Sequence, residues 1–323
     1  MRLTFIPIPD TFIWMSKMNV LRVFLIFIIL SSPVVAEKYA GEFLYLGVGA
    51  RPLALGGAYI ASDGDAFSSY YNPAGLNALD GYQAAFMHSE TFGSLLNHDY
   101  FAVAKRHNKS VAAISLYRLG GGGIIITEED RGIFRKIEEA SHADYAAGFS
   151  YARKQTNRID WGVTAKLIYR KIIDTSAWGI GLDAGMRYHV REDVTAALVM
   201  QDLTGTVLSY SYDNKETINP TMKLGVELVR NYRDFRGTVL ADTDVRFEGR
   251  QASAQFYQSW ISADTHLGFE LSYKNVIAGR IGSDIGNLTT GAGLKFSRYR
   301  IDLALFDHSD LDTSYRGSLI VEW

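Results

Sequence analysis

From residue 82 onward, hydrophobic and polar positions alternate with a period of two in successive short segments. In the clearest example, residues 178–188, apolar side chains at even numbers alternate with glycine or charged residues at odd numbers. The same alternation marks residues 145–151, 161–170, 222–228 and 267–274. Because side chains alternate across a strand, each segment is expected to have one apolar and one polar face. We count roughly 14 segments with this alternation, which predicts an all-β protein.

The composition of the polar faces distinguishes two ways of covering the apolar ones. In a soluble sandwich, the apolar faces pack together and the outward faces carry long charged side chains. Here the charges share their face with many glycines, which weaken a strand but leave room for another piece of chain. Aromatic residues lie mostly at the ends of the apolar faces, where membrane interfaces would fall. This pattern favours a transmembrane antiparallel β-barrel of about 14 strands with a filled lumen.

The connections between these segments also favour a transmembrane barrel. Short polar turns, such as residues 107–109 and 191–193, alternate with longer connections at residues 119–142, 204–218 and 245–264. Bacterial outer-membrane barrels have short periplasmic turns and longer outer loops. If the C-terminus is periplasmic, every short turn falls on the periplasmic side.

The chain ends on a strand that is apolar on one face. Its outward face is formed by Tyr315, Gly317, Leu319, Val321 and Trp323. This ending resembles the insertion signal of bacterial outer-membrane barrels, in which apolar residues at every second position lead to a terminal aromatic. The resemblance implies that the barrel-assembly machinery is a partner during insertion. The alternative is the edge strand of a soluble sandwich.

The N-terminus carries the pattern of an export signal. Residues 23–30 are an unbroken apolar run preceded by basic residues, and cleavage is expected after Ala36. The run is too short to span a bilayer. Residues 1–36 are therefore predicted to be a cleaved signal peptide, with Met15 or Met18 as alternative start sites. Export and the barrel pattern together predict the outer membrane of a Gram-negative-type bacterium as the location, with outer-membrane lipid as a partner.

Composition and motifs give no sign of an enzyme. The chain has no cysteine, which excludes disulfides, thiolate metal sites and cysteine nucleophiles. The formal net charge is −2, which gives no reason to expect a nucleic-acid partner. The seven histidines are scattered, and neither a Gly-x-Ser-x-Gly elbow nor a phosphate loop is present. We expect no catalytic residue, no metal and no cofactor.

Residues 37–80 differ from the rest of the chain, because small residues and turn pairs dominate there. They are expected to form a compact plug, and residues 81–323 the barrel. The residues that carry a family resemblance are Gly49, Ala50, Arg51, Gly56, Gly57, Asn72, Pro73, Ala74 and Gly75. Together they resemble the N-terminal signature of the FadL-like outer-membrane proteins, and within that group the match is nearest to the PorV/PorQ family. The resemblance implies a hatch that plugs the lumen.

The resemblance extends to the C-terminal third, at residues 266–270, 278–282 and 288–294. For PorV/PorQ proteins it implies a non-enzymatic, protein-interacting role in secretion of the type IX kind, with exported proteins or envelope subunits as partners. The wider FadL-like group implies instead the uptake of hydrophobic molecules such as long-chain fatty acids. That alternative needs a lateral opening in the wall, for which a bulge beside Gly179, Gly181 or Gly185, or in the strand at residues 84–87, would serve.

Two further sets of residues are candidates for function. The charges expected to face the lumen are Lys166, Arg170, Asp183, Arg187, Glu227, Glu270, Arg280, Asp302 and Arg316. They could anchor the plug through residues such as Arg51 and Asp65, or line a path for a polar solute. An apolar ligand or loop contact is expected at Ile124, Ile125, Ile126, Ile133 and Phe134, the alternative being packing within the loop or against lipid.

Overall fold

The computed structural model describes residues 41–91, 96–130, 133–212, 214–248, 254–308 and 311–323. The predicted signal peptide, residues 1–36, lies outside this range. The short helices of the chain come first and are η1 (Glu42–Tyr45), α2 (Ala50–Ala54), α3 (Ser68–Tyr71) and η2 (Pro73–Ala78). None of the described helices is both long enough and apolar enough to cross a membrane.

All the remaining described elements are strands. In chain order they are β1 (Tyr82–Thr91), β2 (Leu96–His107), β3 (Ser110–Asp130), β4 (Ile133–Lys154), β5 (Ile159–Ile172), β6 (Thr175–Arg191), β7 (Val194–Gln201), β8 (Thr206–Tyr210), β9 (Lys215–Ile218), β10 (Thr221–Tyr232), β11 (Phe235–Arg246), β12 (Phe256–Gln258), β13 (Ile261–Tyr273), β14 (Ile277–Asp284), β15 (Asn287–Phe296), β16 (Tyr299–His308) and β17 (Leu311–Glu322).

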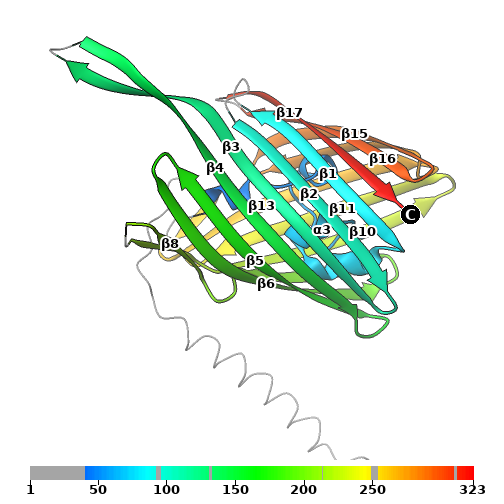
Figure 1. The fold of residues 1–323 in the computed structure, drawn as a ribbon. Coiled ribbons are helices and arrows are strands. Elements are labelled where there is room, and N and C mark those ends of the chain that lie inside the picture. The colour runs from blue at the N-terminus through cyan, green and yellow to red at the C-terminus, as the bar shows by residue number, and fades with distance from the viewer. Residues whose placement is uncertain (1–40, 92–95, 131–132, 213, 249–253, 309–310) are drawn as a thin grey trace, which may run out of the picture. The chain divides into compact units, whose positions relative to one another are not determined.

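The strands form one closed antiparallel sheet (Figure 1). Each wall strand pairs with its neighbours in the chain, and β1 pairs with both β2 and β17. The short strands β8, β9 and β12 extend or flank the wall, which leaves 14 wall strands. The prediction of an all-β transmembrane barrel of about 14 strands is confirmed.

The outward face of the wall is apolar, as the alternation predicts. Large side chains at full or half exposure cover it, including Ile180 (73% exposed), Ile114 (65%) and Leu303 (60%). In water such a belt would strongly favour association, whereas in a membrane the lipid covers it. Aromatic pairs mark one end of the belt, such as Tyr82 with Trp323, whose rings stack at 5.8 Å.

The terminal strand closes the barrel. Tyr82 N–H donates to the Trp323 carbonyl (2.9 Å), and Trp323 N–H donates to the Tyr82 carbonyl (3.0 Å). On the outward face of β17, Tyr315 is 67% exposed and Trp323 is 55% exposed, while Ile320 is buried on the inward face. Gly317, Leu319 and Val321 share the outward face by register. Their role as an insertion signal stays a prediction.

The prediction of long outer loops is wrong for most of their residues. The connection expected at 119–142 is a two-stranded ribbon formed by the ends of β3 and β4, which extends beyond the wall (Figure 1). Parts of the other two connections form β8 and β9 and the short strand β12. The β-branched residues of the first connection, such as Ile125 and Thr127, favour a strand when a partner strand lies opposite.

Candidate functional site

The described part of the N-terminal segment, residues 41–80, lies against the inward face of the wall, and we call it the inner segment (blue in Figure 1). Glycines of the wall make room for it. A Cβ atom at Gly162 would lie 2.6 Å from the Pro73 carbonyl carbon, and one at Gly268 would lie 2.7 Å from the Leu55 carbonyl oxygen. Both distances are too short for a side chain. The glycines of the polar faces therefore permit close packing inside the barrel.

The Asn-Pro-Ala-Gly motif forms a tight turn against β4, β5 and β6. Asn72 Oδ1 accepts from Ala74 N–H (3.0 Å), which caps η2, and its Nδ2 donates to the Ile60 carbonyl (2.7 Å). Asparagine is a preferred residue at this cap position. The side chain of Asn72 also lies against Gly185. The most specific part of the family resemblance is thus a turn that connects two parts of the inner segment beside the wall.

Polar side chains of the wall bind the backbone of the inner segment at several places. The Asp242 carboxylate accepts from the N–H groups of Tyr59 (2.6 Å) and Ile60 (3.0 Å). Thr289 accepts from Gly56 N–H (3.0 Å), and Ser318 accepts from Ala50 N–H (3.2 Å). Gly56 has a φ of +66°, a conformation that favours glycine.

On one side of the lumen, charged groups of alternating sign and one tyrosine form a closed chain of contacts. We call it the arginine–carboxylate ring; its members are Arg51, Glu270, Arg280, Asp302, Arg300, Asp65 and Tyr59. Arg51, from the inner segment, donates to both oxygens of Glu270 at 2.9 and 3.0 Å. Arg280, from the wall, contacts Glu270 (2.5 Å) and Asp302 (2.8 Å).

The inner segment closes the ring on its other side. Arg300 pairs with Asp302 (3.0 Å) and with Asp65. Tyr59 donates to Asp65 (2.9 Å) and accepts from Arg51 (3.0 Å). Three arginines thus face three carboxylates. Charge-assisted bonds of this kind are stronger than neutral ones, and each buried charge here has an opposite partner.

The other predicted lumen charges are also inward-facing, and most find partners. Arg170 pairs with Asp144 (3.0 Å), and Arg187 pairs with Asp63 of the inner segment (2.7 Å). Burial raises the pKa of Asp63, but the Arg187 and Arg236 charges outweigh it, so the pKa of this carboxyl lies below its usual range.

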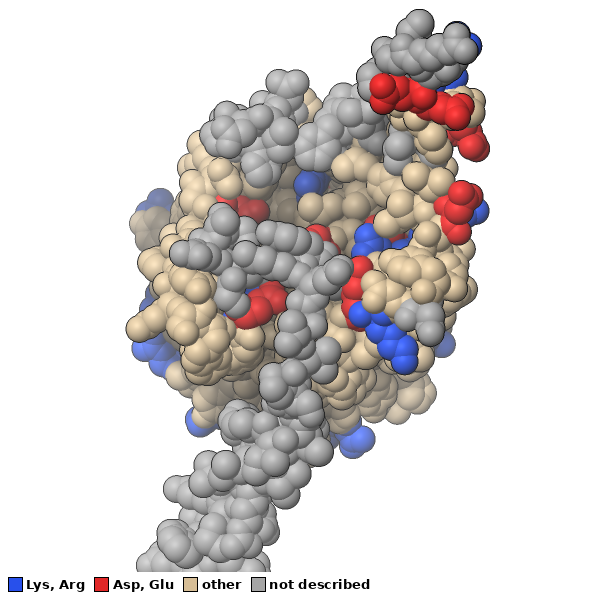
Figure 2. Space-filling model, turned by 90° about the vertical axis from the view of Figure 1, so that its left-hand side faces the viewer, with Lys and Arg blue, Asp and Glu red and all other residues tan. Residues whose placement is uncertain are grey.

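Two of the predicted charges stand apart. Arg316 donates to the Leu46 carbonyl at 2.9 Å. Glu227 is buried on the inward face. Within the described parts of the chain, neither residue forms an ion pair. The lumen shown in Figure 2 accordingly contains both red and blue side chains.

The opposite side of the lumen contains an irregular stretch of one wall strand, residues 202–205 between β7 and β8, which we call the wall break. One backbone hydrogen bond crosses it, from Leu203 N–H to the Leu182 carbonyl (2.8 Å). Residues 181–183 of β6 face six residues there, 201–206. Asp202 has a φ of +51° and turns inward. A bulge beside Gly181 was one of the positions expected for a lateral opening, and the break lies opposite it. The strand 84–87, also considered in that connection, is regularly paired on both sides.

Lys166 holds the wall break from inside the barrel. Its Nζ lies 2.8 Å from both Asp183 and Asp202. Asp202 N–H donates to Asp183 (2.8 Å), and Thr206 donates to Asp202 (2.6 Å). Lys166 and Asp183 were predicted from the polar face, whereas Asp202 was missed because it lies in an interruption of the period-two pattern.

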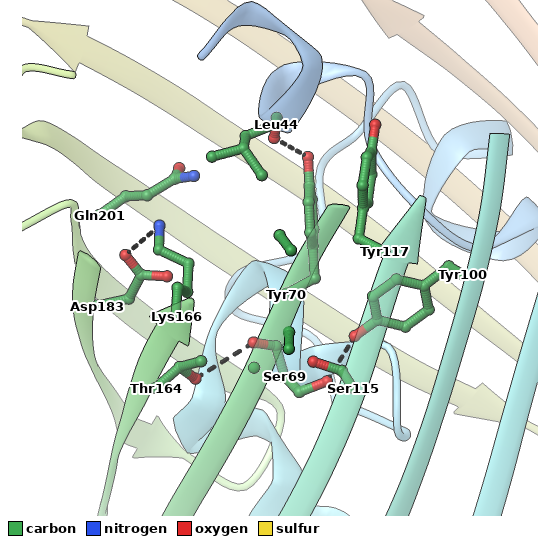
Figure 3. A pocket seen from close by; sticks show the side chains of 13 residues that line it. Leu44, Ser69, Tyr70, Tyr100, Ser115, Tyr117, Thr164, Lys166, Asp183 and Gln201 are labelled. Atoms are coloured by element: carbon green, nitrogen blue, oxygen red, sulfur yellow. Dashed lines mark hydrogen bonds and ion pairs between the residues drawn. The ribbon is translucent and has the colours of Figure 1, made fainter. Parts of the chain in front are cut away.

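A small cavity lies beside this cluster, between Lys166, Asp183 and Gln201 on one side and tyrosines on the other (Figure 3). Tyr70 and Tyr117 form its aromatic side, with rings 6.4 Å apart and nearly parallel. The volume of about 30 Å³ has room for roughly two waters, whereas a benzene-sized ligand needs a cavity of about 150 Å³. The cavity is therefore closed to hydrocarbons in this conformation.

The tyrosines of the inner segment are held as neutral hydrogen-bond donors. Tyr70 donates to the Leu44 carbonyl (2.5 Å), and Tyr71 donates to the Val48 carbonyl (2.9 Å). Burial raises the pKa of both hydroxyls well above the usual value, and it raises the pKa of Tyr45 to about 12. Sequence reasoning missed this tyrosine cluster, although Tyr70 and Tyr71 were visible as adjacent aromatics outside any strand.

The predicted apolar contact residues lie elsewhere. Ile124, Ile125 and Ile126 belong to β3, and Ile133 and Phe134 belong to β4, all on the ribbon beyond the wall. Ile125 is 57% exposed and does not line the cavity. No cluster of metal-ligating side chains occurs among the described residues.

A closed antiparallel barrel with an apolar outward belt, short turns at one end and a polar lumen defines the class of outer-membrane β-barrels. This fold indicates an outer-membrane location. No protein-family model matches the sequence, and neither does any curated protein.

Solved structures of hydrocarbon transporters share the fold. The chain is similar to the toluene transporter TbuX of Ralstonia pickettii (TM-score 0.57, 13% identity, 85% of this chain and 97% of that chain). It is similar to the monoaromatic hydrocarbon channel CymD (TM-score 0.61, 12% identity, 86% and 98%). The toluene transporter TodX of P. putida gives a TM-score of 0.56 at 13% identity (85% and 96%). The chain thus has the fold of the FadL-like outer-membrane barrels, and at this identity the likeness shows the fold alone.

Proposed function

We propose that this protein admits small hydrophobic molecules through the outer membrane, with the inner segment as the closing element and the wall break as the exit into the membrane. The observation that carries the proposal is the position of the cavity. Its tyrosines face the lumen, and its polar side borders the wall break through Lys166 and Asp183. The fold shared with hydrocarbon transporters supports the same class of cargo.

The closed cavity requires a movement before any hydrocarbon passes. The arginine–carboxylate ring anchors the inner segment on the far side of the lumen. Tyr70, by contrast, is held on the cavity side by two hydrogen bonds within the inner segment itself, to Leu44 and from Gly47 N–H (3.1 Å). A shift of residues 70–72 together with residues 41–47 would widen the cavity without breaking the ring. The predicted charges act in this proposal as anchors for the plug.

A reversible cross-link tests both the cargo and the movement. The chain has no cysteine, so an Asn72→Cys/Gly185→Cys pair is the only thiol pair present. A Cβ atom at residue 185 would lie 3.0 Å from the Asn72 Cγ position, and a disulfide places a Cβ about 3 Å from the far sulfur. Uptake of radiolabelled toluene is measured in cells with an intact outer membrane, before and after reduction.

We expect uptake to be fast in the wild type and in the reduced pair, and severalfold slower in the oxidised pair. A single Asn72→Cys variant controls for the oxidant. Equal uptake by cells with and without the protein, for toluene and for a long-chain fatty acid alike, overturns the transport proposal. Fast uptake by the cross-linked protein overturns only the movement of the segment around Asn72.

The PorV/PorQ-like role is the second candidate, favoured by the ribbon of β3 and β4. Ile125 and Ile137 are 57% and 60% exposed on it, beyond the end of the neighbouring strands. A protein partner could cover them. Gentle extraction followed by lipid and protein mass spectrometry separates the two readings. A stoichiometric apolar ligand supports transport, whereas co-purified exported proteins that are lost with Ile125→Ser/Ile137→Ser support the second role.

A further inference from the structure

The end of the barrel that carries the short turns is rich in exposed cations. They are Lys105, Lys109, Arg153, Lys154, Arg158, Arg191, Arg230, Arg233, Lys274 and Arg298. Carboxylates at the surface of this end are fewer. Two of them, Asp193 and Asp234, pair with cations of the rest of the rim. Asp193 contacts both Arg191 (3.3 Å) and Arg230, and Asp234 lies 3.9 Å from Lys274.

One arc of this rim has no such compensation. We call it the basic arc; it comprises Lys105, Lys109, Arg153, Lys154 and Arg158, from the ends of β2 and β4 and the turns that follow these strands. Lys154 N–H donates to the Lys109 carbonyl (2.9 Å), so the two turns are adjacent.

No described carboxylate forms an ion pair with any of the five basic-arc cations. Two acids nearby are used elsewhere. Asp160, opposite Lys154 in the strand register, turns inward to Arg187 and His189. Asp80 lies 3.7 Å from Arg106. The charge of the basic arc is therefore not neutralised by the described side chains.

The aromatic residues next to the basic arc set its depth in the membrane. Tyr151 packs beside Trp161 with ring centres 5.8 Å apart, and Tyr82 lies under Lys105 Nζ at 4.8 Å from the ring centre. Such aromatics mark the membrane–water interface. Arg153 follows Tyr151 by two residues, about 7 Å along a strand. The headgroup layer is about 5–7 Å thick on each side of the hydrocarbon core, so the arc falls within it.

We propose that the basic arc binds the phosphates of anionic phospholipids in the leaflet at the short-turn end. Five cations without carboxylate partners, held at headgroup depth on two adjacent turns, fit lipids whose headgroups carry net negative charge. In zwitterionic phosphatidylethanolamine, the ammonium group competes for the same phosphate. The rest of the rim, where carboxylates accompany the cations, has less attraction for such lipids. This inference is independent of the transported cargo.

The test uses the full-length protein in nanodiscs of mixed phosphatidylethanolamine and phosphatidylglycerol. Lipids that stay bound after gentle release are measured by native mass spectrometry. The test variant is Lys109→Gln/Arg153→Gln/Lys154→Gln/Arg158→Gln. The matched control, Arg191→Gln/Arg230→Gln/Arg233→Gln/Lys274→Gln, removes the same charge from the same end of the barrel. All eight side chains are exposed, so both variants are expected to fold.

We expect the wild type to retain phosphatidylglycerol over phosphatidylethanolamine. The arc variant should lower that ratio by at least about fivefold, and the control should change it little. A wild type without preference, or an equal loss in both variants, overturns the proposal. So does an arc variant that keeps its phosphatidylglycerol but loses a co-purified acidic protein, because the arc would then be a protein-binding surface.

Discussion

The two sides of the lumen hold the inner segment in different ways. On the side of β13 to β16, the arginine–carboxylate ring joins the segment to the wall by charged contacts in which each charge has an opposite partner. On the side of β5 to β8, a single ion pair among the described residues, Arg187 with Asp63, joins the segment to the wall, and the other contacts are neutral tyrosines beside a small cavity and an interrupted strand. The first side anchors the segment. On the second side, a small rearrangement would open a path through the lumen.

The largest expected effect comes from breaking the anchored side at Glu270. A Glu270→Gln substitution leaves Arg51 and Arg280 buried with too little negative charge, and breaking such a buried pair costs about 3–5 kcal/mol. We expect a lower free energy of unfolding in denaturant titrations and faster proteolysis of residues 41–80. Glu139→Gln, in an exposed pair with Lys136, serves as the control and should change neither quantity. Equal midpoints for both variants would contradict the anchoring role.

The next effect tests whether the wall glycines are there to admit the inner segment. In Gly162→Ala, the added methyl group meets the Pro73 and Ala74 backbone, and overpacking of this kind costs about 1–3 kcal/mol. Gly279→Ala is the matched control, because a Cβ atom there has no neighbour within 4 Å. Denaturant unfolding of the two variants separates packing from strand propensity. A loss at Gly279 as large as that at Gly162 would show that packing is not the cause.

A smaller effect is expected on the cavity side. Tyr117→Phe removes the hydrogen bond that the hydroxyl donates to the Phe43 carbonyl, worth about 1 kcal/mol. Tyr151→Phe, at the rim, removes a half-exposed contact with Ser110 and should cost less. The same unfolding measurement applies to both. If Tyr117→Phe destabilised the protein more than Glu270→Gln, the comparison of the two sides would be reversed.

The smallest effect concerns pH and Asp63. Its pKa is lowered in the folded protein, so the ionised carboxylate stabilises the fold above the unfolded value of about 4. This stabilisation is lost as the pH falls through the lowered pKa. Because the side chain is 54% exposed, less than about 1 kcal/mol is expected. The difference in unfolding free energy between wild type and Asp63→Asn should shrink between pH 6 and pH 3; a constant difference would exclude the ion pair as its source.

The sequence by itself determined the architecture, because the period of two assigns each wall residue to the lipid or the lumen. The glycines on the charged faces indicated a filled barrel, because they leave room for another piece of chain. Residues such as Asp183 and Arg187 were assigned to the lumen from their positions in the alternation alone. Long-range partners were not accessible to this reasoning. Glu270 and Arg51 are 219 positions apart, and nothing in the sequence around either residue identifies the other as its partner.

Only the tertiary structure decided where the wall strand is interrupted and which side of the lumen holds the cavity. Residues 202–205 break the period of two, so their inward Asp202 had no signal in the pattern. The connection at 119–142 was predicted as a loop, whereas the structure has a paired ribbon. A strand there depends on a partner strand, and the propensity of single residues does not specify that partner. Alternation is a property of single strands, whereas rings, cavities and breaks arise when strands distant in the sequence are closed into one wall.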